Sequence, residues 1–134
     1  NKRVFLDWFL EMRDQEDIYP LYIGYDPWHI DDSLLAQFQQ EFGKSVMIPV
    51  RQGVATLSAP MKDLKADFGA GNIVYDANPI DRWCFANTYV KTDINGNIQP
   101  SKGHAEKKRI DGTASLLDAY VVLQDKKEEY MSLI

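Results

Sequence analysis

Stretches with helical spacing of apolar residues alternate with short β-branched and aromatic runs, and this alternation is the strongest constraint on the fold. Helices are predicted over residues 3–16, about 31–42, about 60–68, from 79 onward and over 111–129. The apolar face of the first is expected at Phe5, Trp8, Phe9 and Met12, and the cap of the second at Asp31, Asp32 or Ser33. Strands are predicted over residues 19–25, 45–50 and 73–75, and a hairpin over 88–99 with Asn95-Gly96 at its turn. Alternating helices and strands predict an α/β fold.

The length and composition bound the class of protein. A chain of 134 residues is one domain at most. Its one cysteine, Cys84, excludes an internal disulfide and a cysteine-based zinc site, and we expect a buried, inert thiol. No stretch approaches the roughly 18 consecutive apolar residues of a membrane span, so no membrane partner is expected.

The negative charge is concentrated in the first part of the chain. Residues 1–50 carry four Lys or Arg against nine Asp or Glu, whereas residues 51–134 carry eleven of each. This balance argues against a histone-like or transcription-factor role, for which a basic excess is expected. A metal-dependent nuclease stays open, because such enzymes gather carboxylates where their metals bind.

Asp26 is the first candidate for chemistry, since it follows the predicted strand over residues 19–25. Ligands in open α/β sheets collect beyond the carboxyl ends of strands. The alternative is an Asx turn that holds the bend at Pro27-Trp28, and position alone favours this turn.

Asp111 is the second candidate, at the entrance to the last helix. On pattern alone a helix N-cap is the favoured role. A cationic stretch leads directly into it, however, with a net charge of +3 over residues 102–109. Such a stretch could hold a DNA phosphate backbone beside a metal. The candidate DNA-binding residues are Lys102, Lys107, Lys108 and Arg109.

Two carboxylates brought to one sheet edge suit Mg²⁺ or Mn²⁺, which prefer oxygen ligands. Two such ions can activate a water and stabilise the leaving oxygen in phosphodiester cleavage. Asp118, two helical turns after Asp111, could approach a metal, but a solvated helix residue is the favoured interpretation. His29 and His104 are too isolated to define a zinc site or a catalytic triad.

Five blocks of sequence, taken together and in this order, resemble a known family. The chain resembles the C-terminal nuclease domain of the large terminase subunit of tailed bacteriophages, in the HK97-like branch. The blocks are Gly24-Tyr25-Asp26-Pro27-Trp28; residues 57–64; Asn78-Pro79 with Arg82-Trp83-Cys84 and Asn87; residues 91–93 with Asn95-Gly96-Asn97; and Arg109-Ile110-Asp111-Gly112 with Ala114 and Ala119.

The resemblance implies an RNase H-like mixed sheet flanked by helices and a metal-dependent endonuclease acting on double-stranded DNA. In such proteins the cut trims concatemeric viral DNA as it is packaged. The family's catalytic carboxylates come from the first strand, the end of a later strand and the start of the final helix. Asp26 matches the second of these places and Asp111 the third. The implied partners are double-stranded DNA, the terminase small subunit and the procapsid portal, and the implied location is the cytoplasm of the bacterial host.

The sequence departs from the family pattern at the first carboxylate, because no acidic residue lies in a strand ahead of Asp26. We therefore expect residues 1–134 to be a nuclease domain without its first strands and without the ATPase domain, and to cleave weakly or not at all. The strand over residues 19–25 would then lack a neighbour, which predicts a homodimer or strand exchange.

Two other interpretations stay open. One is another RNase H-like nuclease, such as a resolvase or transposase core, although the Asn-Pro and Arg-Trp-Cys block makes this less favoured. The other is a docking or structural fragment of the packaging machine that does not cut DNA. Metal binding that depends on Asp26 and Asp111 would separate the nuclease from the docking fragment.

Overall fold

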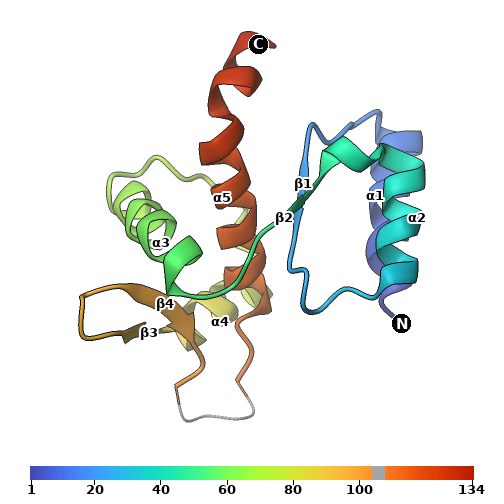
Figure 1. Cartoon of the computed structure of the whole chain (residues 1–134). Coiled ribbons are helices and arrows are strands. Elements are labelled where there is room, and N and C mark those ends of the chain that lie inside the picture. Colours follow the sequence, from blue (N-terminus) through green and yellow to red (C-terminus); the bar gives the residue numbers. More distant parts are fainter. Residues whose placement is uncertain (104–107) are drawn as a thin grey trace.

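The computed structural model describes residues 1–103 and 108–134, which form layers of helices around a short parallel sheet (Figure 1). Strands β1 (Ile23–Tyr25) and β2 (Met47–Pro49) lie between helices α1 (Arg3–Glu16) and α2 (Asp32–Phe42) on one side and α3 (Val54–Gly69) and α5 (Asp111–Ser132) on the other. The remaining elements are the short helix η1 (Lys44–Val46), helix α4 (Pro79–Asn87) and the antiparallel hairpin β3 (Tyr89–Thr92) and β4 (Ile98–Ser101). The predicted α/β class is confirmed.

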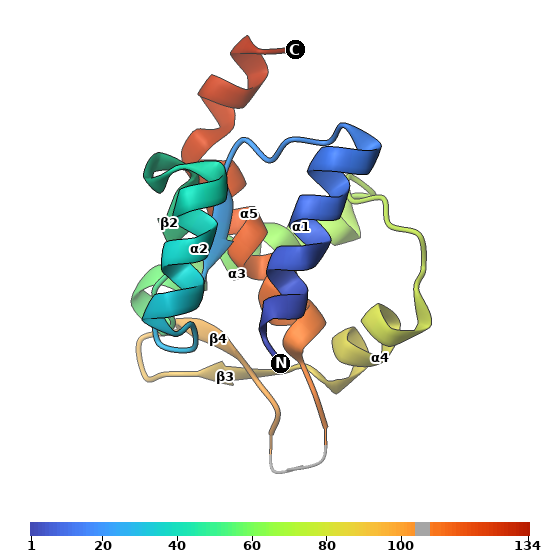
Figure 2. The ribbon, with the colours of Figure 1, turned by 90° about the vertical axis from the view of Figure 1, so that its right-hand side faces the viewer.

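The parallel sheet has an apolar cluster on each face, because successive side chains of a strand point to opposite sides. Ile23 and Met47 face α1 and α2, which lie side by side in Figure 2. Val50, just beyond β2, packs with Leu117 on the opposite side, against α3 and α5. The full clusters are Leu6, Ile23, Leu34, Phe38 and Met47 on the first face, and Val50, Leu57, Leu64, Leu117 and Val122 on the second.

Local capping explains where several elements begin. Of the three residues that could cap the second helix, Asp31 does so, accepting a hydrogen bond from the Leu34 amide at 2.7 Å. Asn78 caps α4 in the same way, with Pro79 in the first turn. The predicted hairpin and its Asn95-Gly96 turn are confirmed, and Gly96 adopts a φ of +77°.

Several predicted elements have different bounds or do not form. The second strand is shorter than the predicted residues 45–50, because η1 takes up Lys44–Val46 and β2 covers only Met47–Pro49. The first strand is limited to Ile23–Tyr25, because β2 offers only Met47–Pro49 as a parallel partner. The third helix begins at Val54 rather than near residue 60, and Pro60 lies inside it. Residues 73–75 form no strand; Tyr75 is instead held by edge-to-face contacts with Phe68 and Phe85. In the part of the chain that is described, no helix is both long and apolar enough to cross a membrane.

The inward face of α1 also differs from the prediction. Phe5 and Trp8 are 60% and 54% exposed, whereas Leu6 is 1% exposed and joins the core. Phe9 does point inward, and its ring makes edge-to-face contacts with Phe38 and Phe42. Helical spacing identified the helix, but it did not distinguish the covered face from an adjacent apolar face that the described residues leave exposed.

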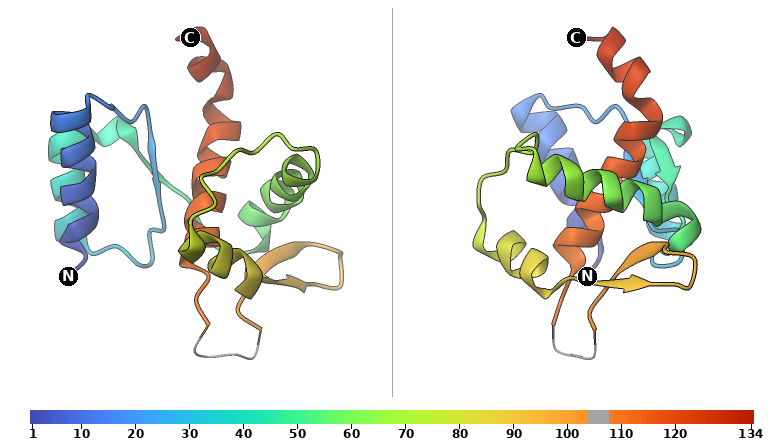
Figure 3. Two further views of the ribbon diagram at one scale, coloured as in Figure 1. Left: turned by 180° about the vertical axis from the view of Figure 1, so that it is seen from behind. Right: turned by 90° about the vertical axis from the view of Figure 1, so that its left-hand side faces the viewer.

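Helices α3 and α5 are joined by a polar contact at the edge of their apolar interface. The Tyr120 hydroxyl donates a hydrogen bond to Asp67 Oδ2 at 2.5 Å. This bond and burial raise the pKa of Tyr120 to about 12 and the same bond lowers the pKa of Asp67. The contact ties α5 to α3, which crosses it at a steep angle (Figure 3), and α5 in turn packs against β1.

Strand β1 approaches α5 most closely at Gly24. A Cβ atom at this position would lie 2.8 Å from Val122 Cγ2 and 3.2 Å from the Asp118 carbonyl oxygen. The second of these neighbours is backbone and cannot rotate away. Only glycine therefore allows β1 to lie this close to the helix, and the residues after β1 are brought beside the middle of α5.

We predict that Gly24→Ala destabilises the fold by about 1–3 kcal/mol, because the added methyl group overpacks the β1–α5 contact. Gly69→Ala is the matched control, since a Cβ there meets nothing within 4 Å and its φ is not positive. The control should be neutral or slightly stabilising. Urea unfolding of both variants measures the difference, and equal stabilities would contradict the importance of the close approach.

Candidate active site

Asp26 directly follows β1 and is held in a tight turn. Its Oδ1 accepts a hydrogen bond from the Trp28 amide at 2.9 Å, which confirms the Asx turn. His29 Nδ1 lies 2.5 Å from Oδ2, and Lys2 Nζ donates to the His29 carbonyl oxygen at 2.6 Å. The Asp26 side chain is 22% exposed. The turn thus fixes the carboxylate in a defined direction while leaving part of it accessible to a ligand.

Asp118 is the carboxylate of α5 that lies close enough to Asp26 for the two negative charges to repel each other. Gln52 Nε2 donates to Asp118 Oδ1 at 3.2 Å and to the Val50 carbonyl oxygen at 3.0 Å, so it ties the end of β2 to α5. Burial raises the pKa of Asp118, the hydrogen bond from Gln52 lowers it, and the negative charge of Asp26 raises it further. Asp118 is therefore half-buried, not the solvated helix residue favoured by the sequence. It belongs to a polar cluster made of Asp26, His29, Gln52 and Asp118.

Asp111 is the first residue of α5 and is exposed. The N-cap position belongs to Ile110, and no side chain caps the helix, so the capping role suggested for Asp111 is wrong. A negative charge in the first turn is favourable with the helix dipole. Asp111 lies seven residues before Asp118, which corresponds to about 10 Å along the helix axis. Of the two predicted carboxylates, Asp26 is thus adjacent to the middle of α5 and Asp111 stands at its start.

The cationic residues before Asp111 are partly described. Lys108 Nζ lies 5.6 Å from the centre of the Tyr89 ring, and the Arg109 carbonyl oxygen accepts a hydrogen bond from Asn87 Nδ2 at 3.2 Å. Arg109 is exposed and Lys102 is partly exposed. Lys107 and His104 lie outside the described residues. The start of α5 is fixed further by a hydrogen bond of 2.8 Å between the Oγ1 atoms of Thr88 and Thr113.

The carboxylate oxygens of this region suit a hard divalent cation in donor type. Within residues 1–103 and 108–134, no group of three or more His, Cys, Asp or Glu side chains is placed to hold a metal. The oxygen donors of these residues are of the type that Mg²⁺ and Mn²⁺ prefer. Their number is low, because the described part of the chain places fewer than three such side chains together.

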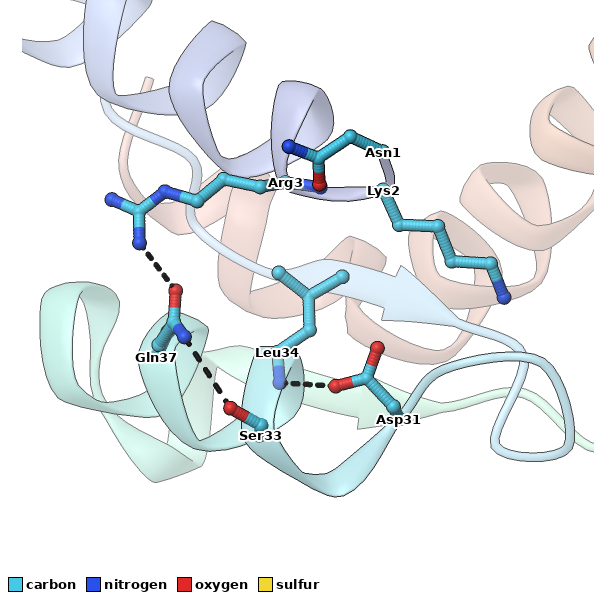
Figure 4. A pocket seen from close by; sticks show the side chains of 7 residues that line it. All are labelled: Asn1, Lys2, Arg3, Asp31, Ser33, Leu34 and Gln37. Carbon is cyan, nitrogen blue, oxygen red and sulfur yellow. Dashed lines mark hydrogen bonds between the residues drawn. The ribbon is translucent and has the colours of Figure 1, made fainter.

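A separate pocket lies between the starts of α1 and α2 (Figure 4). Its polar side chains bind one another: Arg3 Nη1 donates to Gln37 Oε1 at 2.7 Å, and Gln37 Nε2 donates to Ser33 Oγ at 3.4 Å. None of the predicted catalytic or DNA-binding residues lines it. The pocket gives no reason to move the candidate site away from the β1–α5 contact.

Comparison with known proteins decides the family. The family model described as "Terminase large subunit, endonuclease domain" matches residues 17–127, which is most of the chain. The chain belongs to this terminase endonuclease-domain family. The resemblance inferred from the sequence is therefore confirmed.

Two individual proteins resemble this terminase domain. "Protein YmfN" of Escherichia coli (strain K12) is 40% identical over 75 residues, which are 54% of this chain and 16% of YmfN. The crystal structure of the HK97 bacteriophage large terminase matches 91% of this chain and 25% of its own, with a TM-score of 0.73 and 18% identity. At this identity the HK97 likeness establishes a shared fold. The chain spans no more than a quarter of the length of either protein.

Sequence reasoning missed two members of the polar cluster in this terminase domain. His29 follows Asp26 by three residues within one tight turn, and that spacing was a usable signal. Gln52 follows β2 as Asp26 follows β1, and the carboxyl ends of parallel strands meet at the same edge of a sheet. The burial of Asp118 could not be predicted from its neighbours in sequence, because it depends on the close approach of β1 to α5.

We predict that Asp118→Asn raises the melting temperature of the domain at pH 7. Folding raises the pKa of this carboxyl, so its ionised form opposes folding, whereas the amide still accepts the bond from Gln52. The gain in melting temperature over the wild type should vanish as the pH falls below about 4, where the Asp118 carboxyl is protonated in the folded and in the unfolded state. Thermal unfolding at the two pH values measures this, with the exposed Asp125→Asn as control. A lower melting temperature than wild type at pH 7 would contradict the burial argument.

Proposed function

We propose that this chain carries part of a metal-dependent endonuclease that cuts concatemeric double-stranded viral DNA during genome packaging. The observation that supports it best is the placement of Asp26, at the carboxyl end of a parallel strand and beside α5, in a chain of the terminase endonuclease family. We assign residues 1–134 to that nuclease domain and its sheet to the RNase H-like type. Location in the cytoplasm of the bacterial host belongs to the same proposal.

Asp26 and Asp111 are the proposed catalytic residues and metal ligands. The turn holds the Asp26 carboxylate through the Trp28 amide, and the Asx geometry limits its rotation. A bound Mg²⁺ or Mn²⁺ would activate the attacking water and stabilise the leaving oxygen. Asp111, in the exposed first turn of α5, can reach a ligand without disturbing the core.

The cationic residues are proposed to position DNA rather than to take part in bond cleavage. The nine residues before Asp111 contain the four proposed DNA-binding residues, Lys102, Lys107, Lys108 and Arg109. Phosphates held by them would lie next to the proposed metal. The terminase small subunit and the procapsid portal are the proposed protein partners. Association of two copies through the open edge of β1 is part of the same proposal, because that edge has no strand partner among the described residues.

Cleavage by residues 1–134 alone should be weak or absent. The described residues contain no third grouped metal ligand, which limits both metal affinity and charge stabilisation. The same observation favours a second candidate function, a docking fragment of the packaging machine that does not cut DNA. Metal binding, rather than cleavage, therefore separates the two candidates.

The test is a titration with Mn²⁺, followed by its electron paramagnetic resonance signal, of the wild-type chain, Asp26→Asn and Asp111→Asn. The nuclease proposal predicts binding by the wild type and clear weakening in both variants. Asp125→Asn is the matched control, because Asp125 is an exposed carboxylate further along α5. Equal binding by all four proteins, or none by the wild type, would overturn the proposal in favour of docking. Robust plasmid nicking that requires Asp111 would contradict the expectation of weak activity.

A further inference from the structure

One face of the β3–β4 hairpin carries a row of hydrogen-bond donors. In an antiparallel ladder, side chains of directly paired residues share a face, and residues two apart along a strand do too. Tyr89 pairs with Ser101 and Lys91 with Gln99, so these four side chains lie together. Lys108 joins them from outside the hairpin, with its Nζ 5.6 Å from the centre of the Tyr89 ring. The five residues, here called the hairpin face, are Tyr89, Lys91, Gln99, Ser101 and Lys108.

The hairpin is fixed to the rest of the domain through β4 and through the residue that precedes β3. Helix α3 packs against β4, and the buried Ser58 Oγ accepts a hydrogen bond from the Ile98 amide at 2.9 Å. Figure 3 shows the hairpin beneath α3, near the start of α5. The residue before β3, Thr88, is hydrogen bonded to Thr113 in the first turn of α5. The hairpin face is thus held in a constant position relative to Asp111.

The charge of the hairpin face suits a polyanion. Lys91 and Lys108 are its charged members, and none of the five is acidic. Asp93, two residues after Lys91, is bound within the turn: it accepts hydrogen bonds from the Asn95 and Asn97 amides at 2.8 and 2.9 Å. The hydroxyl of Ser101 accepts from the Gly103 amide, which leaves its proton to be donated to a ligand. Lysine, tyrosine, serine and glutamine side chains are common donors to DNA phosphates.

The Tyr89 ring has a structural partner on this face. Gly103, with a φ of +66°, lies so near that a Cβ there would be 3.2 Å from the ring atom Cδ2, and Lys108 approaches the same ring. The ring is 53% exposed and lies under the Lys108 ammonium group, so it orients this lysine. Duplex DNA is taken as the ligand because the function proposed above acts on double-stranded DNA, and single-stranded DNA is the alternative that the test below addresses. A two-stranded ribbon is also narrow enough to enter the major groove.

We propose that the hairpin face binds the phosphate backbone of double-stranded DNA and sets the position of the duplex relative to Asp111. The proposal rests on the nuclease function proposed above. It adds the hairpin side chains to the Lys102–Arg109 stretch, with Lys108 common to both. Lys91 and Lys108 contact phosphates, Gln99 and Ser101 donate further hydrogen bonds, and Tyr89 is a positioning residue that holds Lys108.

Binding of a fluorescein-labelled duplex by the 134-residue chain, followed by fluorescence anisotropy in EDTA over a range of NaCl concentrations, tests this surface without cleavage. Lys91→Gln should weaken binding about fivefold. It should also lower the slope of log affinity against log salt by about one, the value for one lost phosphate contact. Lys44→Gln is the matched control, because Lys44 is exposed and begins η1, on the other side of the sheet. The control should change affinity less than twofold.

Two further variants test the role of the ring. Tyr89→Phe keeps the face on which Lys108 lies and should retain most of the affinity, whereas Tyr89→Leu should weaken binding as Lys91→Gln does. Equal effects of Lys91→Gln and Lys44→Gln, or tighter binding of single-stranded DNA than of duplex, would overturn the proposal. Absence of any duplex binding by the wild type would overturn it too. The Mn²⁺ titration needs no DNA, so a failure of the hairpin face and a failure of the metal site can be told apart.

Discussion

The close approach of β1 to α5 at Gly24 is the contact on which the rest of the arrangement depends. The strand is three residues long and has a single partner strand among the described residues, so hydrogen bonding alone could not hold it firmly. Its position comes instead from burial on both faces, with Ile23 packed on one side and Val122 beneath Gly24 on the other. That packing brings Asp26 beside Asp118, and Gln52 completes the link from the end of β2.

The architecture separates two kinds of charge. Asp26 and Asp118 lie where β1 meets α5, and burial, followed by the negative charge of Asp26, raises the pKa of Asp118. Basic side chains lie on the hairpin and before α5, and they are connected to the same helix through Thr88 and Thr113. A bound cation would stabilise carboxylates that repel each other, and a bound anion would stabilise neighbouring lysines. The two halves of this pattern are what a protein needs when it holds a metal next to a phosphate backbone.

Much of the fold could be predicted from the sequence because the signals are local. The cap at Asp31, the Asn78-Pro79 start and the Asn95-Gly96 turn each depend on a few adjacent residues. What failed depends on tertiary contacts: Phe5 and Trp8 follow helical spacing, yet Leu6 is the buried residue. The roles of Asp26 and Asp111 stay predictions, whereas the resemblance that suggested them is confirmed by the family match. Asp118 was undervalued, since its burial follows from the Gly24 contact and not from its own neighbours in sequence.

The central proposal is that Asp26, beside the β1–α5 contact, and Asp111, at the start of α5, hold a divalent cation, and residue-resolved NMR with Mg²⁺ tests it most directly. The account predicts saturable amide shifts concentrated in residues 24–28 and 110–119, and their loss in Asp26→Asn. Shifts confined to the exposed acidic residues of α1 and α2, or unchanged in Asp26→Asn, would contradict it.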